Sequence, residues 1–221
     1  MKTGSLKIAA FTALLTALTL GGSIWGFIIL AGPNSVSRLN VISSEDLALP
    51  LIIAVFLCGG GLWGLGIARL MKADAKSLAM TIMFTWSVML IIVIALVAAG
   101  GFSKINVLPI FPHYRHYNFL LIWVPAVGIV TAITAYVASD KLGFKEKKKS
   151  VGMYTGLAAA LGFLTMGVVL PLGFGWEVGY HIIGKSGMLK ILLFCSIGAA
   201  LTGGATLGWM LSKAGSIREK A

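Results

Sequence analysis

The chain has 221 residues, of which 58% are hydrophobic and 11% are charged, and it carries a formal net charge of +11. A basic protein of this kind could bind nucleic acid, but such binding uses a basic patch on a soluble domain. So much apolar sequence leaves no room for a soluble domain, and we interpret the positive charge as a signal for membrane insertion instead.

Six long stretches of the chain contain no Asp, Glu, Lys, Arg or His. Each stretch is long enough to cross the hydrocarbon core of a bilayer, which takes about 20 apolar residues at the rise of an α-helix. We therefore predict an all-α integral membrane protein, a six-helix bundle that forms a single transmembrane domain. In chain order the predicted spans are 8–31, 47–68, 77–101, 119–138, 151–173 and 191–212.

Basic residues concentrate in every second gap between the spans. The two terminal segments and the gaps 69–76 and 139–150 hold thirteen of the 18 Lys and Arg residues, and the other three gaps hold five. Because Lys and Arg are retained on the cytoplasmic side during insertion, we predict a cell-membrane protein with both termini in the cytoplasm. The run 145–149 could also touch anionic lipid headgroups, which would anchor the chain without defining its function.

The spans pair into three hairpins whose centres recur about every 70 residues. The second and sixth spans share a local sequence pattern in which glycines lie close to one tryptophan, in the segments 60–64 and 203–209. This recurrence is compatible with three tandem two-helix hairpins. The alternative is that membrane hairpins simply resemble one another, since residue-level identity between them is thin.

Small residues recur every four positions along the first span, at Ala9, Ala13, Ala17 and Gly21. Residues four apart lie on one face of a helix, and small side chains allow close approach of helices in lipid. We interpret this face as a docking surface for another membrane protein or for a second copy of the chain. Ordinary close packing inside the bundle is the alternative.

The beginning of this span, residues 7–18, resembles the first helix of the substrate-binding components of energy-coupling-factor vitamin transporters. Those are small six-helix proteins with both ends inside, and an alanine pair four apart on that helix docks their shared transmembrane partner. The resemblance covers about 20 residues and the overall topology. It implies a partner for the alanine face, but the outer half of the chain contains no matching vitamin-binding signature.

The spans lack ionisable side chains, which counts against a self-sufficient proton-coupled carrier, a voltage sensor and a proton relay. They also lack a nucleophile–base pair, a phosphate-binding glycine loop and a metal-spaced cluster. We therefore predict no catalytic residue and no cofactor, and enzyme activity is the weakest functional class, although metal chemistry on the outer face stays open.

The three histidines, His113, His116 and His181, all fall on the predicted outer side, and Glu177 precedes the last of them by four residues. Imidazole nitrogens with a carboxylate suit zinc or copper, so these four residues are weak candidates for a metal site. The alternative is an aromatic belt at headgroup level, to which Tyr114 would belong. A loop that covers a ligand from outside is a third interpretation.

The function predicted from the sequence is a membrane transport component that binds or passes a small solute. We place its site in the outer half of the bundle, where Trp86 falls near mid-span and Trp123 near the boundary, close to Tyr114, His116 and His181. The alternative is a non-catalytic accessory or scaffold subunit of a larger membrane complex. A transport component needs a hydrated or ligand-sized cavity between its helices, whereas a scaffold should be solid.

Overall fold

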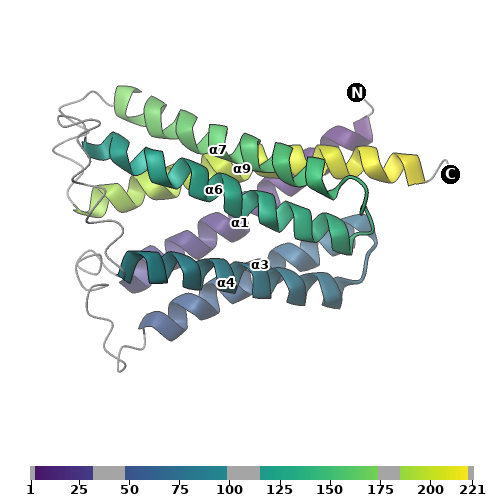
Figure 1. The fold of residues 1–221 in the computed structure, drawn as a ribbon, viewed down its shortest axis with the longest axis horizontal. Helices are drawn as coiled ribbons and strands as arrows, with labels where there is room; N and C mark the ends of the chain where they lie inside the picture. The colour runs from purple at the N-terminus through teal and green to yellow at the C-terminus, as the bar shows by residue number, and fades with distance from the viewer. Residues whose placement is uncertain (1–2, 32–47, 99–114, 174–184, 219–221) are drawn as a thin grey trace.

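The computed structural model describes residues 3–31, 48–98, 115–173 and 185–218 of the chain. These residues form six α-helices, without a strand among them, and each helix is long and apolar enough to cross a membrane. The predicted six-helix architecture is thereby confirmed, and the structure supports a multi-pass membrane protein (Figure 1). The helices are α1 (Thr3–Ala31), α3 (Ala48–Met71), α4 (Ala75–Ala98), α6 (Arg115–Lys141), α7 (Lys148–Gly173) and α9 (Lys185–Arg218).

Several helices extend beyond the predicted apolar spans because charged residues at a helix end do not interrupt the helix. The first helix begins at Thr3 and not at residue 8, and α9 continues to Arg218 and not only to residue 212. Lysine and arginine have high helix propensity, and their long side chains can reach water from the edge of an apolar layer. The apolar pattern therefore marks the membrane layer, not the full length of the helix.

Each helix packs against the next helix along the chain, and α1 packs against α9, so the six helices form a closed circuit. The contact between α1 and α9 is extensive, whereas the contact between α4 and α6 is slender. The N-terminal end of α1 and the C-terminal end of α9 lie at the same end of the bundle, together with the α3–α4 and α6–α7 connections (Figure 1). The contact between the first and last helices therefore closes the circuit.

The α3–α4 and α6–α7 connections are built in the same way. At the end of α3 the amide of Ala73 donates to the carbonyl of Ala68 at 2.9 Å, and at the end of α6 the amide of Phe144 donates to the carbonyl of Ser139 at 2.9 Å. Each is the 6→1 backbone hydrogen bond of a Schellman motif. This motif requires the residue before the donor to adopt a left-handed backbone conformation. Gly143 supplies that residue after α6 with a φ of 84°, and Lys72 supplies it after α3 with a φ of 52°.

The helix that follows the first of these connections is capped by Asp74. Its carboxylate Oδ1 accepts hydrogen bonds from the amides of Lys76 and Ser77, at 3.0 and 3.2 Å. A carboxylate at this position satisfies amides that have no partner within the helix and complements the helix dipole. The sharp turn and the cap together fix where α4 begins.

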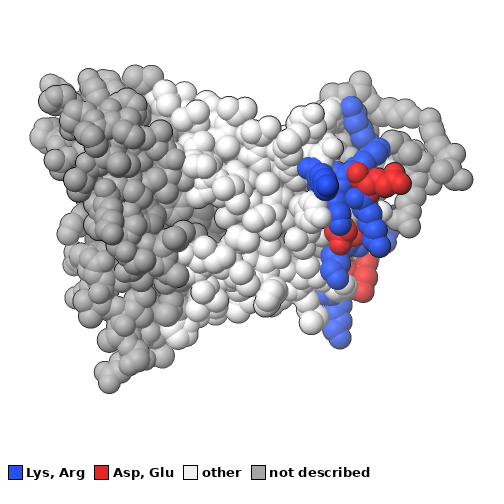
Figure 2. Space-filling view, viewed as in Figure 1, with Lys and Arg blue, Asp and Glu red and all other residues white. Residues whose placement is uncertain are grey.

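Charged side chains gather at one end of the bundle (Figure 2). This is the end at which the α3–α4 and α6–α7 connections lie. Among the residues whose side chains are described, the basic ones outnumber the acidic ones clearly. The basic side chains are Lys7, Arg69, Lys72, Lys76, Lys141, Lys145, Lys147, Lys148, Lys149 and Lys213, and the acidic ones are Asp74, Asp140 and Glu146.

Candidate functional site

Trp86, one of the predicted ligand-binding residues, belongs to α4 and packs against α3. Its side chain is 8% exposed, and its ring centroid lies 6.4 Å from that of Trp63 with an angle of 34° between the planes. A Cβ atom at Gly60 would lie 3.3 Å from the Trp86 indole, so the absence of a side chain there lets the ring lie against α3. Trp86 is therefore part of the packed core, and its ligand-binding role stays a prediction.

Trp63 is the residue that sequence reasoning missed. It is 2% exposed, and its indole Nε1 donates a hydrogen bond to Thr16 Oγ1 at 2.8 Å, which links α3 to α1. The Thr16 hydroxyl in turn donates to the carbonyl of Thr12 at 2.7 Å. A buried indole N–H needs a partner, and this rule could have marked Trp63, which lies inside the second predicted span, as a residue that links two helices.

Trp123 lies in a different part of the core from Trp86. It packs against an apolar cluster of α6, α7 and α9 that includes Leu120, Phe163 and Cys195, whereas Trp86 belongs to the cluster that includes Trp63. The structure therefore places the two tryptophans of the predicted ligand site in separate packing clusters. The two cysteines are also separate, since Cys195 is buried in this cluster and Cys58 is exposed, and both are free thiols.

The remaining residues of the predicted outer site are not described. Tyr114 and His181 lie outside the described residues, and so do the metal candidates His113 and Glu177. His116 belongs to the first turn of α6, but its side chain also lies outside the described part. The side chains that are described contain no group of three or more His, Cys, Asp or Glu suited to a metal ion. The outer ligand site and the metal site stay predictions.

The small residues of α1 lie against α9 within the same chain. Ala9 and Ala13 are buried, and a Cβ atom added at Gly208 or Gly204 would lie 2.9 Å from the Cα atom of Ala9 or Ala13, respectively. A Cβ at Gly21 would similarly lie 3.4 Å from the Ile197 side chain. Ala17, the fourth residue of this face, is half-buried. A role of the same face in docking another protein stays a prediction.

Hydroxyl groups in the described membrane spans mostly bond to their own helix. Typical cases are Thr85, which donates to the carbonyl of Thr81 at 2.8 Å, and Thr134, which donates to that of Val130 at 2.9 Å. Such bonds use the only donor hydrogen of the hydroxyl, so a bound solute could find only an acceptor there. Thr155 differs, because its Oγ1 is buried without a hydrogen-bond partner among the described residues. The same back-bonding geometry holds for Thr12, Thr16, Thr19, Ser23, Thr81, Ser87, Ser139, Thr165, Thr202 and Thr206.

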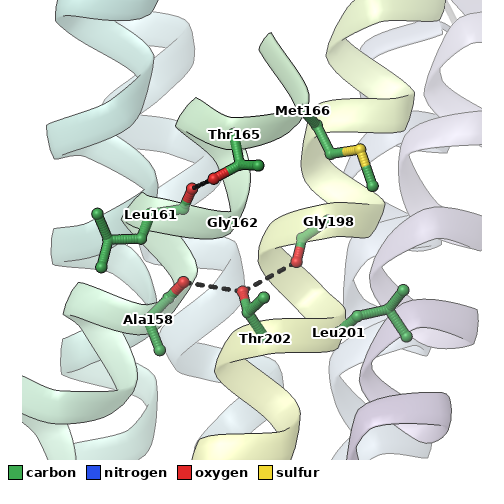
Figure 3. A pocket seen from close by; sticks show the side chains of 8 residues that line it. All are labelled: Ala158, Leu161, Gly162, Thr165, Met166, Gly198, Leu201 and Thr202. Carbon is green, nitrogen blue, oxygen red and sulfur yellow. Dashed lines mark hydrogen bonds between the residues drawn. The ribbon is translucent and has the colours of Figure 1, made fainter. Parts of the chain in front are cut away.

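A cavity of about 400 Å³ lies in a groove between α7 and α9 (Figure 3). It opens sideways, because Leu161 and Leu201 on its rim are 61% and 40% exposed on the surface that would face lipid. The sequence did not predict it, since its walls are residues of ordinary apolar helix. The lining residues are Ala158, Leu161, Gly162, Thr165, Met166, Gly198, Leu201 and Thr202.

The floor of this groove is a point where the two helix backbones meet. A Cβ atom at Gly162 would lie 2.6 Å from the carbonyl oxygen of Gly198 and would collide with the Thr202 hydroxyl. That hydroxyl donates across the interface to the carbonyl of Ala158 at 2.8 Å, and within α9 to the carbonyl of Gly198 at 2.9 Å (Figure 3). The groove is therefore a fixed feature of the α7–α9 interface with almost wholly apolar walls.

No protein-family model matches this chain, and no curated protein or solved structure is significantly similar to it.

Proposed function

We propose that this protein is a non-catalytic accessory subunit of a larger membrane complex. The observation that carries the proposal is that the described interior is close-packed, while a groove opens sideways toward lipid. Trp63, Ile67, Phe163 and Leu211, which come from three different helices, are each no more than 2% exposed. A solute path through the bundle would instead require a hydrated or ligand-sized gap between facing helices.

The back-bonded hydroxyls support the same proposal. A polar solute that crosses a membrane must exchange its water for polar groups of the protein, because unsatisfied polar groups in an apolar medium cost several kcal/mol. Here most of the described Thr and Ser hydroxyls in the spans, such as those of Thr85 and Thr134, already donate to backbone carbonyls. The described interior thus offers a polar solute few free hydrogen-bond donors to replace the water molecules that it would lose.

The α7–α9 groove is the surface on which we propose that a transmembrane helix of the partner docks. Helices in lipid associate where small residues let them approach closely. Gly162 and Gly198 bring α7 and α9 together and, having no side chains, leave the groove above them open to a third helix. The exposed Leu161 and Leu201 would flank the incoming helix. The alanine face of α1 already packs against α9. A partner that docks on this face could therefore contact only the part that α9 leaves exposed, such as the half-buried Ala17.

A transport component is the second candidate, and the size of the groove favours it. Pockets for small molecules measure about 300–1,000 Å³, and the groove at about 400 Å³ falls in that range. Because it opens to lipid, its ligand would be an apolar molecule and not a polar solute. The outer site first predicted for such a function, at Trp86, Trp123, Tyr114, His116 and His181, remains part of this second candidate.

Filling the groove distinguishes the two functions. We expect wild type to co-purify with a membrane protein in a mild detergent and the double variant Leu161→Trp and Leu201→Trp to lose it, because the indoles would occupy the docking surface. The control carries Leu157→Trp and Leu164→Trp, two exposed leucines of α7 that do not line the groove. Mass spectrometry of the purified proteins would identify bound proteins and small molecules together.

A partner protein that is retained by the control and lost from the groove variant is the result we expect. Retention of the partner by both variants would contradict docking at this groove. Loss of a bound apolar molecule, with no protein lost, would support the transport candidate in place of the accessory subunit.

We further propose that the protein lies in the cell membrane, with its charged end and both termini on the cytoplasmic side. The concentration of lysine and arginine at the end that carries both described connections supports this orientation.

We also propose that the bundle consists of three tandem two-helix hairpins. It is supported by the matching Schellman motifs that end α3 and α6, the second helices of the first two hairpins.

A further inference from the structure

We propose that the charged end of the bundle binds the phosphate headgroups of anionic phospholipids, chiefly through the α6–α7 connection. Residues 140–149 contain five lysines and two carboxylates. Anionic lipids attract basic clusters that lie immediately beside a membrane span, where each residue contributes on the order of 1 kcal/mol. The inference does not depend on which partner or solute the protein serves.

One lysine of this connection is neutralised and the others are not. The Lys148 ammonium Nζ lies 2.7 Å from Asp140 Oδ1 and 4.9 Å from the centre of the Tyr136 ring. Lys145, Lys147 and Lys149 are exposed, and no ion pair joins them to a carboxylate among the described residues. The pairing of Lys148 uses up the nearest carboxylate and leaves a net positive surface.

The connection is held firmly at the level where the spans end. Leu142 is 6% exposed, and Phe144 packs against the same apolar cluster, so both side chains tie the turn to the bundle. The apolar span of α6 ends at Lys141, and that of α7 begins at Lys148. The backbone of the connection is therefore held where the apolar spans end, and the exposed lysine side chains lie within reach of lipid headgroups.

This position favours a lipid headgroup over a soluble polyanion. On a neighbouring helix, Lys213 Nζ lies 3.8 Å from the centre of the Trp209 ring, the kind of aromatic contact found at membrane interfaces. Binding of nucleic acid would need a basic surface that stands away from the membrane. The described basic residues instead form a band across the helix ends on the face that Figure 2 shows.

The test uses the full-length protein in lipid nanodiscs, with phosphatidylcholine alone or with about a third of the lipid replaced by phosphatidylglycerol. Native mass spectrometry would measure phosphatidylglycerol retained by the protein. We expect wild type to retain it selectively at physiological salt. We expect the Lys145→Gln, Lys147→Gln and Lys149→Gln triple variant to retain about 100-fold less. These side chains are exposed, so the variant should fold.

The control removes the same number of charges from the opposite end, through Arg115→Gln, Lys185→Gln and Lys190→Gln. The proposal requires this control to retain phosphatidylglycerol as wild type does. Equal retention by wild type and both variants would overturn it. Displacement of bound lipid by a single-stranded oligonucleotide, but not by inorganic phosphate, would also overturn it, in favour of nucleic acid.

Discussion

Substituting Gly208 and Gly204 by alanine should destabilise the bundle, because both residues lie in the contact between α1 and α9. A Cβ atom at Gly208 would lie 2.7 Å from Thr12 Oγ1 and 2.8 Å from the carbonyl oxygen of Ile8. One at Gly204 would lie 2.9 Å from the carbonyl oxygen of Thr12. Backbone atoms cannot move aside as a flexible side chain can.

The two helices must therefore separate to admit the added methyl groups. Overpacking of a tight interface typically costs about 1–3 kcal/mol, and we expect each single variant to lose that much free energy of unfolding. The double variant should lose more, although the two losses need not add because both act on one interface. Reversible unfolding in mixed detergent micelles, followed by circular dichroism, would measure these changes.

Gly22 of α1 provides the matched control. A Cβ atom there would have no neighbour within 4 Å, so Gly22→Ala should leave the stability unchanged or raise it slightly through helix propensity. Equal stability of Gly208→Ala, Gly22→Ala and wild type would show that α1 and α9 are not in the contact described here.

Replacing Trp63 by alanine should cost about 3–5 kcal/mol, the range for a large aromatic side chain removed from a packed core. Trp63 is 2% exposed and contacts Trp86, and it carries the hydrogen bond from α3 to Thr16 of α1. Its removal would leave a cavity and would also break the polar link between the two helices.

Two further variants separate the cavity from the hydrogen bond. Trp63→Phe keeps an aromatic ring but lacks the donor, and Thr16→Val lacks the acceptor and leaves the indole N–H unpaired. Hydrogen bonds between membrane helices contribute about 0.6 kcal/mol on average and up to about 1.7. A double-mutant cycle of the two variants should give a coupling energy in that range. A coupling energy of zero would mean that the Trp63–Thr16 bond does not stabilise the protein.

The six helices could be predicted from sequence because the membrane imposes a length and a composition on each of them. The stretch 77–101, for example, has no charged residue, and the structure gives helix α4 over Ala75–Ala98. The basic end could be predicted as well, because its lysines stand between the apolar stretches. Both features are properties of contiguous sequence.

The partners of individual residues could not be predicted because they depend on which helices meet. The alanine face of α1 has the spacing of a docking surface, and the spacing is the same whether α9 or another protein covers it. The sequence places both Trp86 and Trp123 in the outer half of the predicted bundle, yet the two side chains lie in different packing clusters. The α7–α9 groove arises where Gly162 meets Gly198, and no local pattern distinguishes these from the other 26 glycines.

The orientation of the charged end is the claim on which the account depends, and thiol labelling tests it most directly. Cys58 and Cys195 would first be replaced by alanine, and single cysteines would then be introduced at Arg115 and Lys147, at opposite ends of the bundle. A membrane-impermeant maleimide added outside intact cells should label position 115, and should label position 147 only after the membrane is opened. Labelling of position 147 in intact cells, or equal labelling of both positions, would contradict a six-span bundle whose basic end faces the cytoplasm.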